Sequence, residues 1–352
     1  MLAAIPEQEE AKRLLRSALG EEPAHAYLFH GPRGVGKRRT AVAFAAELLG
    51  EQARVERGTH PDLYVLEPVG DQIRIDEIRR LRRDLRLRPF EAERRVYLVL
   101  GADLMNEDAA DALLKDLEEA PDYAVIVLVA DQLEPLPATI RSRCQHVPFR
   151  LLSRRAVLEY LAAHGPELSP QALEQVARVA AGRLDRAERL LDPEQAGRRR
   201  ALVALSRSTY RDERFDAGAT VSVIVDYARA AADEAQERVS ARAEAAAEPP
   251  PTKELEQEAR RAARGAEREA VLDALDLLAG WYRDLLAVEV CAEGAVLNSD
   301  FLAELREDAG LVGTVAARAA EIVLETRLTF ELNVTPGLAL EALFVRLRQL
   351  RR

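Results

Sequence analysis

The sequence predicts an α/β domain built around a parallel sheet, followed by two helical regions. Across residues 1–150, short apolar runs alternate with amphipathic stretches of helical period, which is typical of parallel strands covered by helices. Near the start of this region, a strand-like run leads through a glycine-rich loop into a helix. After residue 150 the strand-like runs stop, and the periodicity is helical to the end of the chain.

Five apolar runs in the first region are expected to form the strands of the sheet. Each is short and is separated from the next by loop or helical sequence. Because helical stretches connect successive strands, a parallel arrangement is expected. The expected strands are Ala26–His30, Asp62–Leu66, Arg95–Leu100, Ala124–Ala130 and Gln145–Phe149.

Two of the connecting helices carry features beyond their apolar face. The helix between the second and third strands has arginines at most positions of 79–86 on its polar face. A solvated, ion-paired surface is the ordinary interpretation of such a face, while contact with DNA or another subunit stays open. A later helix is expected to begin after Asn106, a good N-cap, with Glu107 and Asp108 in its first turn.

The rest of the chain is expected to form two helical regions. Residues 151–205 predict short helices, a small bundle or lid, with Ser153 and Ser169 as caps and Gly182 as a helix end. Residues 206–352 predict a larger helical region. It contains a segment rich in Ala, Glu and Arg at about 235–266, interrupted by Pro249–Pro251. Two helices joined by a proline elbow are expected there, with a partly disordered charged linker as the alternative.

Composition limits the class of protein. A net charge of −10 argues against a non-specific nucleic-acid coat, although a local basic surface stays open. The two cysteines, Cys144 and Cys291, predict no disulfide framework and no four-ligand zinc site. The N-terminus lacks the pattern of a signal peptide, and the longest apolar run, 123–130, is too short to cross a bilayer. We therefore expect a cytoplasmic protein with no membrane partner.

The glycine-rich loop has the sequence of a phosphate loop. It follows the first expected strand and opens a helix, as the G-x-x-x-x-G-K pattern requires for backbone N–H groups and a lysine to surround phosphates. Candidate phosphate-binding residues are Gly31, Pro32, Gly34, Val35, Gly36, Lys37 and Arg38.

Two residues that would hold Mg²⁺ in such a site are missing. Arg38 stands where a Ser or Thr hydroxyl is required, and the strand that should end in Asp runs into Leu100-Gly101. Thr40 lies nearly a helical turn away from the required position. The sequence therefore predicts no hydrolysis of nucleotide. Two possibilities stay open: the loop binds ATP or ADP weakly, or it is an inherited phosphate loop that binds no nucleotide.

Seven short motifs together resemble the delta-prime family of bacterial DNA polymerase III clamp-loader subunits, part of the AAA+ clamp-loader family. They occur in order over most of the chain, outside the proline-containing insertion. The motifs are Thr59-His60-Pro61-Asp62, Ile73–Arg79, Ala112–Glu119, Thr139–Cys144, Gly182–Ala187, Trp281–Leu286 and Asn333–Glu341.

The resemblance implies an architecture and a set of partners. Residues 1–150 would be an AAA+ P-loop module with a degenerate site, 151–205 its helical lid, and 206–352 a helical collar for oligomerisation. The chain would be the rigid stator of a hetero-oligomer with gamma/tau ATPase and delta subunits, which opens the sliding clamp and places it on primed DNA. It would be a component of the DNA polymerase III holoenzyme, and by itself neither an ATPase nor a polymerase.

The resemblance also implies roles for individual residues. Arg143, in the Ser142-Arg143-Cys144 motif, would be an arginine finger reaching the neighbouring subunit's nucleotide, although a surface arginine is the plainer interpretation. Arg186 matches the family's second sensor arginine, or else pairs with an acidic neighbour. The cysteines of the family's zinc module are absent from 50–59, so no zinc is expected and His60 is expected to be structural.

Two alternatives come from other functional classes. An autonomous AAA+ ATPase requires an acidic pair after Val99 and a hydroxyl after Lys37, and the sequence supplies neither. A stand-alone DNA-binding module requires a positive domain whose binding weakens steeply with salt. Subunit numbers, contact with single-strand-binding protein and the role of Pro249–Pro251 are not indicated by the sequence.

Overall fold

The computed structural model describes residues 2, 5–70, 72–164, 168–244, 252–330 and 334–350. The chain forms two compact units. The first comprises Met1–Glu167 with Ala181–Ala187, and the second comprises Leu168–Ala180 with Glu188–Arg352. The expected lid, 151–205, is therefore divided between the two units, and the three-region division stays a prediction.

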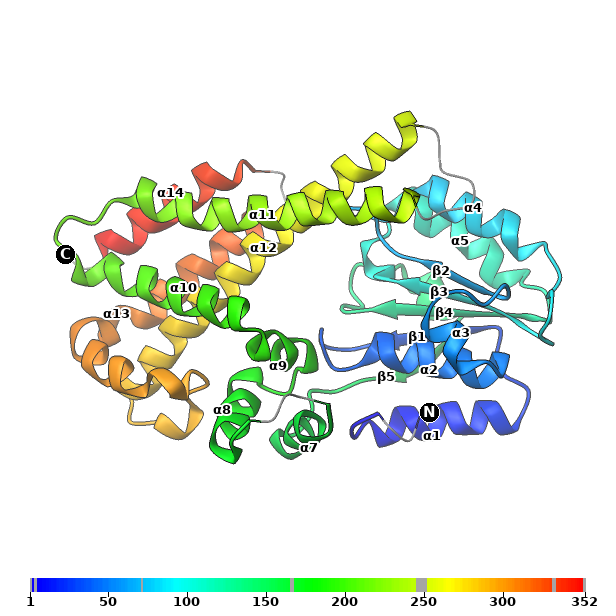
Figure 1. Ribbon diagram of the computed structural model, residues 1–352, viewed down its shortest axis with the longest axis horizontal. Helices are drawn as coiled ribbons and strands as arrows, with labels where there is room; N and C mark the ends of the chain where they lie inside the picture. The colour runs from blue at the N-terminus through cyan, green and yellow to red at the C-terminus, as the bar shows by residue number, and fades with distance from the viewer. Residues whose placement is uncertain are drawn as a thin grey trace. The chain divides into compact units, whose positions relative to one another are not determined.

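The first unit contains a five-stranded parallel sheet, as the sequence predicts (Figure 1). The strand order is β2-β3-β4-β1-β5, so β1 lies between β4 and β5 with the phosphate loop at its carboxyl end. In this register Phe29 pairs with Val129 and Val147. The strands are β1 (Ala26–His30), β2 (Leu63–Leu66), β3 (Arg95–Leu100), β4 (Ala124–Ala130) and β5 (Gln145–Pro148).

Helices cover both faces of the sheet. Helices α1 and α2 share a core with one face, and α4 and α5 share a core with the other. The remaining elements of this unit are short, except α7, which follows the last strand. The bounds are α1 (Glu9–Gly20), α2 (Lys37–Leu49), α3 (Gln52–Glu56), α4 (Ile75–Leu85), η2 (Ala102–Leu104), α5 (Glu107–Glu118), α6 (Ala138–Arg141) and α7 (Arg154–His164).

Alternation along the strands explains why the sheet has two cores. Tyr27 and Phe29 of β1 pack with α1 and α2, whereas Leu28 between them packs with α4 and α5. Every residue of β3 and β4 is buried. Continuous apolar runs such as 124–130 are therefore typical of a parallel sheet covered on both faces, as seen here.

Helices begin and end at the capping residues and the glycine that the sequence predicts. The Asn106 side chain accepts the N–H of Ala109 at 3.1 Å and caps α5. Ser153 accepts the N–H of Ala156 at 3.1 Å and caps α7 in the same way. Gly182 has φ +81°, and a Cβ there would lie 2.5 Å from the carbonyl oxygen of Leu152, so only glycine fits.

Asp62, in one of the shared motifs, anchors a loop of the first unit. Its fully buried carboxylate accepts the N–H groups of Phe90, Glu91 and Ala92 at 2.6, 2.9 and 2.9 Å. The side chain of His60 accepts the Asp62 N–H at 3.1 Å, which supports its expected structural role in the turn into β2. Asp62 is thus the acceptor that holds the segment before β3.

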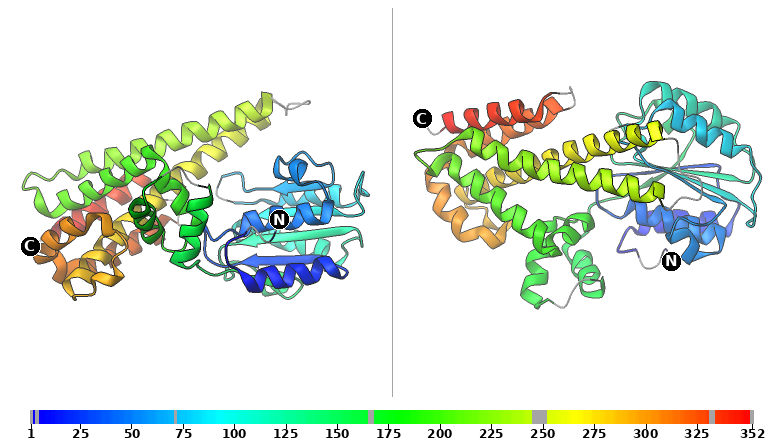
Figure 2. Two further views of the ribbon diagram at one scale, coloured as in Figure 1. Left: turned by 60° about the horizontal axis from the view of Figure 1, so that its bottom comes forward. Right: turned by 45° about the horizontal axis from the view of Figure 1, so that its top comes forward.

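The second unit is helical. Helix α9 begins in the first unit, and the others belong to the second. The two long helices α11 and α12 lie side by side as a hairpin (Figures 1 and 2), which confirms two helices flanking the predicted elbow. Pro249–Pro251 and Asn333 lie outside the described residues. The bounds are α8 (Pro170–Ala180), α9 (Leu184–Leu191), α10 (Pro193–Arg211), α11 (Ala217–Glu244), α12 (Thr252–Glu289), η3 (Glu293–Ala295), η4 (Ser299–Phe301), α13 (Leu302–Thr329) and α14 (Pro336–Gln349).

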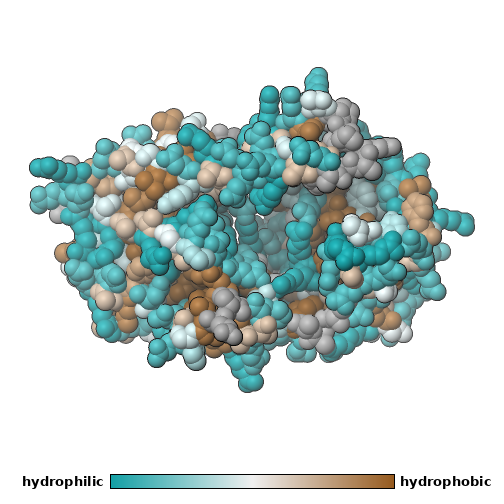
Figure 3. All heavy atoms as spheres, in the orientation of Figure 1, coloured by the Kyte–Doolittle hydropathy of each residue, from teal (hydrophilic) through white to brown (hydrophobic). Residues whose placement is uncertain are grey.

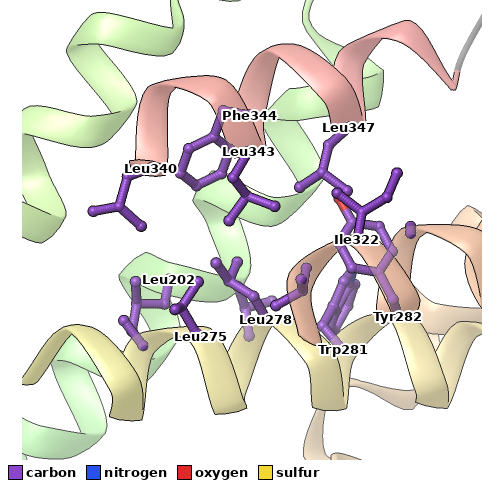
Figure 4. Packing of buried hydrophobic residues seen from close by; sticks show 14 of the residues in the cluster. Leu202, Leu275, Leu278, Trp281, Tyr282, Ile322, Leu340, Leu343, Phe344 and Leu347 are labelled. Carbon is purple, nitrogen blue, oxygen red and sulfur yellow. The ribbon is translucent and has the colours of Figure 1, made fainter. Parts of the chain in front are cut away.

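The core of the second unit is centred on Trp281, which is fully buried. In Figure 4 leucines of α14 face Leu275 and Leu278 of α12 across this core. The Trp281 ring N–H donates to the Tyr210 hydroxyl at 3.0 Å, and that hydroxyl donates to Asp308 at 2.7 Å. The chain of bonds joins α12, α10 and α13 and satisfies a buried carboxylate.

The face shown in Figure 3 is mostly hydrophilic, with apolar residues in small separate areas. Within the residues that the structure describes, none of the helices has the length and apolar character needed to cross a membrane.

We predict that Asp62→Asn lowers the free energy of unfolding by about 2 kcal/mol at pH 7. The carboxylate accepts three N–H groups with its two oxygens, whereas the amide has only one acceptor oxygen. Burial raises the pKa of Asp62, but the three backbone N–H groups outweigh it, so the pKa is lowered. Its contribution is therefore present above the unfolded pKa and lost as the pH falls through the folded one. Urea titrations at pH 7 and pH 3 should show the difference shrinking at low pH. The exposed substitution Asp122→Asn is the control, and an equal loss in both variants would contradict the assignment.

Candidate functional site

The glycine-rich loop has a backbone conformation that requires glycine at three positions. Gly31, Gly34 and Gly36 have φ values of +138°, +77° and +97°. A Cβ on Gly31 would lie 2.2 Å from the carbonyl oxygen of Phe149, which only glycine avoids. Helix α2 begins directly after Gly36, so its first N–H groups lie at the loop.

Lys37 is turned into its own loop. Its ammonium donates to the carbonyl oxygens of Gly31 and Pro32, each at 2.6 Å, and pairs with Asp131 at 2.7 Å. The side chain is only 4% exposed. Three donors thus meet three acceptors, so the ammonium is satisfied within the protein.

The electrostatics around Lys37 follow from burial and three carboxylates. Burial lowers the pKa of Lys37, while Asp131, Asp103 and Asp185 oppose that change. A buried ammonium is stable as a cation only beside such partners. The same three carboxylates make this edge of the sheet less favourable for a polyphosphate than an unopposed lysine would be.

Asp103 connects the ends of β3 and β4. Its carboxylate accepts the N–H groups of Asp131 and Gln132, both at 3.1 Å. Burial, with the neighbouring Asp131 charge, raises the pKa of Asp103. Asp103 therefore orders the loop that presents Asp131 to Lys37.

Asp185 lies against the loop from another part of the chain. Its carboxylate is so close to Gly34 that a Cβ there would be 1.8 Å from Oδ1. The N–H of Leu184 donates to the carbonyl oxygen of Gly34 at 2.7 Å. The N–H of Arg186 donates to the Asp185 carboxylate at 2.7 Å, and the sensor role of Arg186 stays a prediction.

The remaining loop residues are engaged in local contacts. Val35 is buried in the core of the first unit. The Arg38 guanidinium pairs with Glu67 at 2.5 Å. The Thr40 hydroxyl is buried and donates to the carbonyl oxygen of Gly36 at 2.9 Å.

A pocket of about 430 Å³ lies beside the loop. It is bounded by Gly36, the first turns of α2 and residues of α3 and α7. On its wall the Arg39 guanidinium lies 5.0 Å from the ring centre of Tyr160, a cation–π contact, and Tyr160 stacks on His164. The pocket combines flat side chains with a cationic group next to the phosphate loop.

The Ser142-Arg143-Cys144 segment follows the short helix α6 and leads into β5. Arg143 is 37% exposed and its guanidinium pairs with Glu118, with Nε to Oε1 at 2.7 Å. Arg143 Nη1 also donates to the carbonyl oxygen of Thr139 at 3.0 Å, and Ser142 donates to the same oxygen. Burial raises the pKa of the Cys144 thiol to about 12, so this cysteine stays protonated and serves packing.

The arginine-rich face of α4 is at least partly ion-paired. Arg79 pairs with Asp76 at 3.1 Å, and Arg82 pairs with Asp116 of α5 at 2.8 Å. These contacts agree with the ordinary interpretation of the face.

For metals, the described part of the chain contains no group of three or more His, Cys, Asp and Glu side chains placed to hold an ion.

Sequence reasoning missed two carboxylates of this site. Asp131 is the first residue after β4, the strand next to β1. The strand order was therefore the signal that could have placed Asp131 at the edge of the loop. The contact of Asp185 with Gly34 had no local signal, because the two residues are far apart in the sequence.

Comparisons with known proteins agree with the motifs. Residues 7–153 match the family profile described as DNA polymerase III, delta subunit. The chain is 37% identical over 196 residues to a DNA polymerase III subunit delta-prime of Pseudomonas aeruginosa, which covers 51% of this chain and 60% of that protein. It is 32% identical over 180 residues to the subunit delta-prime of Bacillus subtilis, covering 48% and 54%. The chain thus spans somewhat more than half the length of these relatives.

The fold is shared with a solved structure. A DNA polymerase III gamma subunit-related protein from Thermotoga maritima superposes over 97% of this chain and 100% of its own, with a TM-score of 0.52 and 17% identity. The predicted fold class, an α/β domain with a parallel sheet and flanking helices followed by helical regions, is therefore confirmed. Together the motifs and the matches show that the chain is a relative of the delta-prime subunits of bacterial DNA polymerase III.

Proposed function

We propose that this protein is a delta-prime-like stator of the DNA polymerase III clamp loader. It assembles with gamma/tau ATPase and delta subunits, acts on the sliding clamp through them, and helps load it on primed DNA. Its own contribution to ATP turnover is Arg143, supplied as an arginine finger to the neighbouring ATPase subunit. The relatives named as delta-prime subunits support the assembly part of this proposal.

The observation that carries the proposal is the contrast between Lys37 and Arg143. The Lys37 ammonium is buried and satisfied by its own loop and Asp131. The Arg143 guanidinium lies at the surface, on a segment anchored by the buried Cys144. A planar guanidinium offered from outside a nucleotide site suits the oxygens of a transferring phosphoryl group.

The phosphate loop itself is proposed to be non-catalytic. No cofactor is required, and any binding of ATP or ADP is weak and without hydrolysis. The candidates for it are the loop, Arg186 and the adjacent 430 Å³ pocket. Arg38 offers no metal ligand, and the 50–59 segment offers no cysteines for zinc. An autonomous ATPase is the less supported alternative for the same reason.

The helical unit offers a surface for assembly. Leu324 and Leu328 on α13 are 49% and 58% exposed, and Leu338 on α14 is 69% exposed. Arg346 of α14 forms an ion pair with Glu325 of α13 at 2.6 Å. Exposed apolar side chains on this pair of helices support contact with another subunit.

The net charge of −10 gives no support to the alternative function, a stand-alone DNA-binding module.

We predict that Arg143→Ala lowers DNA-stimulated ATP turnover of the reconstituted gamma/tau, delta and delta-prime assembly by at least about tenfold, because a charge stabilising the transition state is removed. Size-exclusion chromatography should show the assembly intact. Arg155→Ala, which removes another exposed arginine of the first unit, is the control. Unchanged turnover in Arg143→Ala would leave the protein a scaffold only.

A second prediction concerns the phosphate loop. In Asp131→Asn, Lys37 loses its carboxylate partner, so calorimetric titration of the isolated protein with ADP should show about tenfold tighter binding. Glu134→Gln removes a charge from the same loop and should leave the affinity unchanged. Equal affinity in both variants would show that Asp131 does not oppose nucleotide binding.

A further inference from the structure

Arg143 does not stand alone on the surface. Glu118, the last residue of α5, faces its guanidinium on one edge, with Nε 2.7 Å from Oε1 and Nη2 in contact with the same oxygen. On the other side, Nη1 donates to the carbonyl oxygen of Thr139 at 3.0 Å. Two elements, α5 and α6, therefore determine where this side chain lies.

The contacts with Glu118 and Thr139 use only some of the N–H donors of the Arg143 guanidinium. A guanidinium has five N–H donors, one on Nε and two on each terminal nitrogen. The contacts with Glu118 and Thr139 engage one donor on each of the three nitrogens, which leaves one N–H on Nη1 and one on Nη2. One donor on each terminal nitrogen is enough to contact two oxygens of one phosphate group.

The position of Glu118 is unusual in electrostatic terms. A helix C-terminus carries partial negative charge, so a carboxylate there is unfavourable unless a cation compensates it. Glu118 and Glu119 both lie at this end of α5. Glu119 is near Lys115, at 3.9 Å, within its own helix, whereas Glu118 is paired across to Arg143.

The pair contributes little to folding, because both side chains are well exposed, at 37% and 49%. Such surface pairs add at most a small stability. What the pair does restrict is the rotamer freedom of a long side chain, which is otherwise lost only when the arginine meets its target. A preoriented donor is worth more in a transition state than a mobile one.

We propose that Glu118 is a positioning residue for Arg143. It holds the Nε edge of the guanidinium, so that the terminal N–H groups are presented to a phosphate of the neighbouring subunit's nucleotide. This inference rests on the proposed finger function of Arg143. Glu118 itself touches neither nucleotide nor reacting atoms.

Glu118 could also act against Arg143, and the two roles predict opposite changes in ATP turnover. If Glu118 competed with the phosphate for Arg143, removing it would free the arginine and raise turnover. If Glu118 positions Arg143, its removal lowers turnover at saturating ATP. The direction of the change in kcat therefore decides between the two.

The test uses the reconstituted clamp-loader assembly with primed DNA and the sliding clamp. Glu118→Ala is expected to lower kcat for ATP about tenfold with KM nearly unchanged, since orientation matters in the transition state. Glu118→Gln keeps an acceptor for Nε and is expected to lose about threefold. Glu119→Gln, one residue away and outside the pair, is the matched control and should retain full kcat. Thermal unfolding midpoints should agree among all four proteins.

A double-variant comparison separates this inference from the function on which it rests. In Arg143→Ala, the further change Glu118→Ala should have no additional effect on kcat, because the residue acts through Arg143. A low kcat for Arg143→Ala with normal or raised kcat for Glu118→Ala overturns the positioning role alone. Normal kcat for Arg143→Ala overturns the finger itself. An additional loss of kcat in the double variant shows that Glu118 acts by another route, and also overturns the proposal.

Discussion

A buried ammonium must be neutralised, and in this protein that requirement organises the phosphate loop. Lys37 lies in the interior of the loop, where two carbonyl oxygens and Asp131 satisfy it. Asp131 can meet it because Asp103 holds the start of the loop after β4. Asp185 then lies on Gly34 from the segment before α9. The loop thus joins β1, β4 and α9 as a structural junction whether or not it binds nucleotide.

This junction explains how a degenerate site can persist in a stable module. The glycines are required by φ and by close backbone contacts, as at Gly31, although Arg38 stands where a phosphate loop that binds Mg²⁺ has a hydroxyl. The proposed activity depends on a different property of the same module, which is the rigid presentation of a surface arginine. Asp62, Cys144 and the continuous burial of β3 and β4 supply that rigidity.

Most of the α/β architecture was predictable because its signals are local. Three strands, including β3 and β4, have the predicted bounds, and β2 begins one residue later than predicted, at Leu63. The Asn106 cap and the helices flanking the proline insertion were predictable for the same reason. The contact of Asp185 with Gly34 was not, since it joins segments far apart in sequence. The pairing of Arg143 with Glu118 likewise depends on how α5 and α6 pack, which no single motif encodes.

The central claim is that the chain acts on a neighbour's nucleotide and not through its own loop. The most direct test is ATP turnover by the assembly carrying Lys37→Met, a substitution that removes the ammonium while keeping an unbranched side chain. The account predicts turnover equal to that of the native assembly once correct folding is verified by circular dichroism. A fall to the level of an assembly lacking this subunit, with the variant still folded and assembled, would contradict it, because turnover would then depend on this loop.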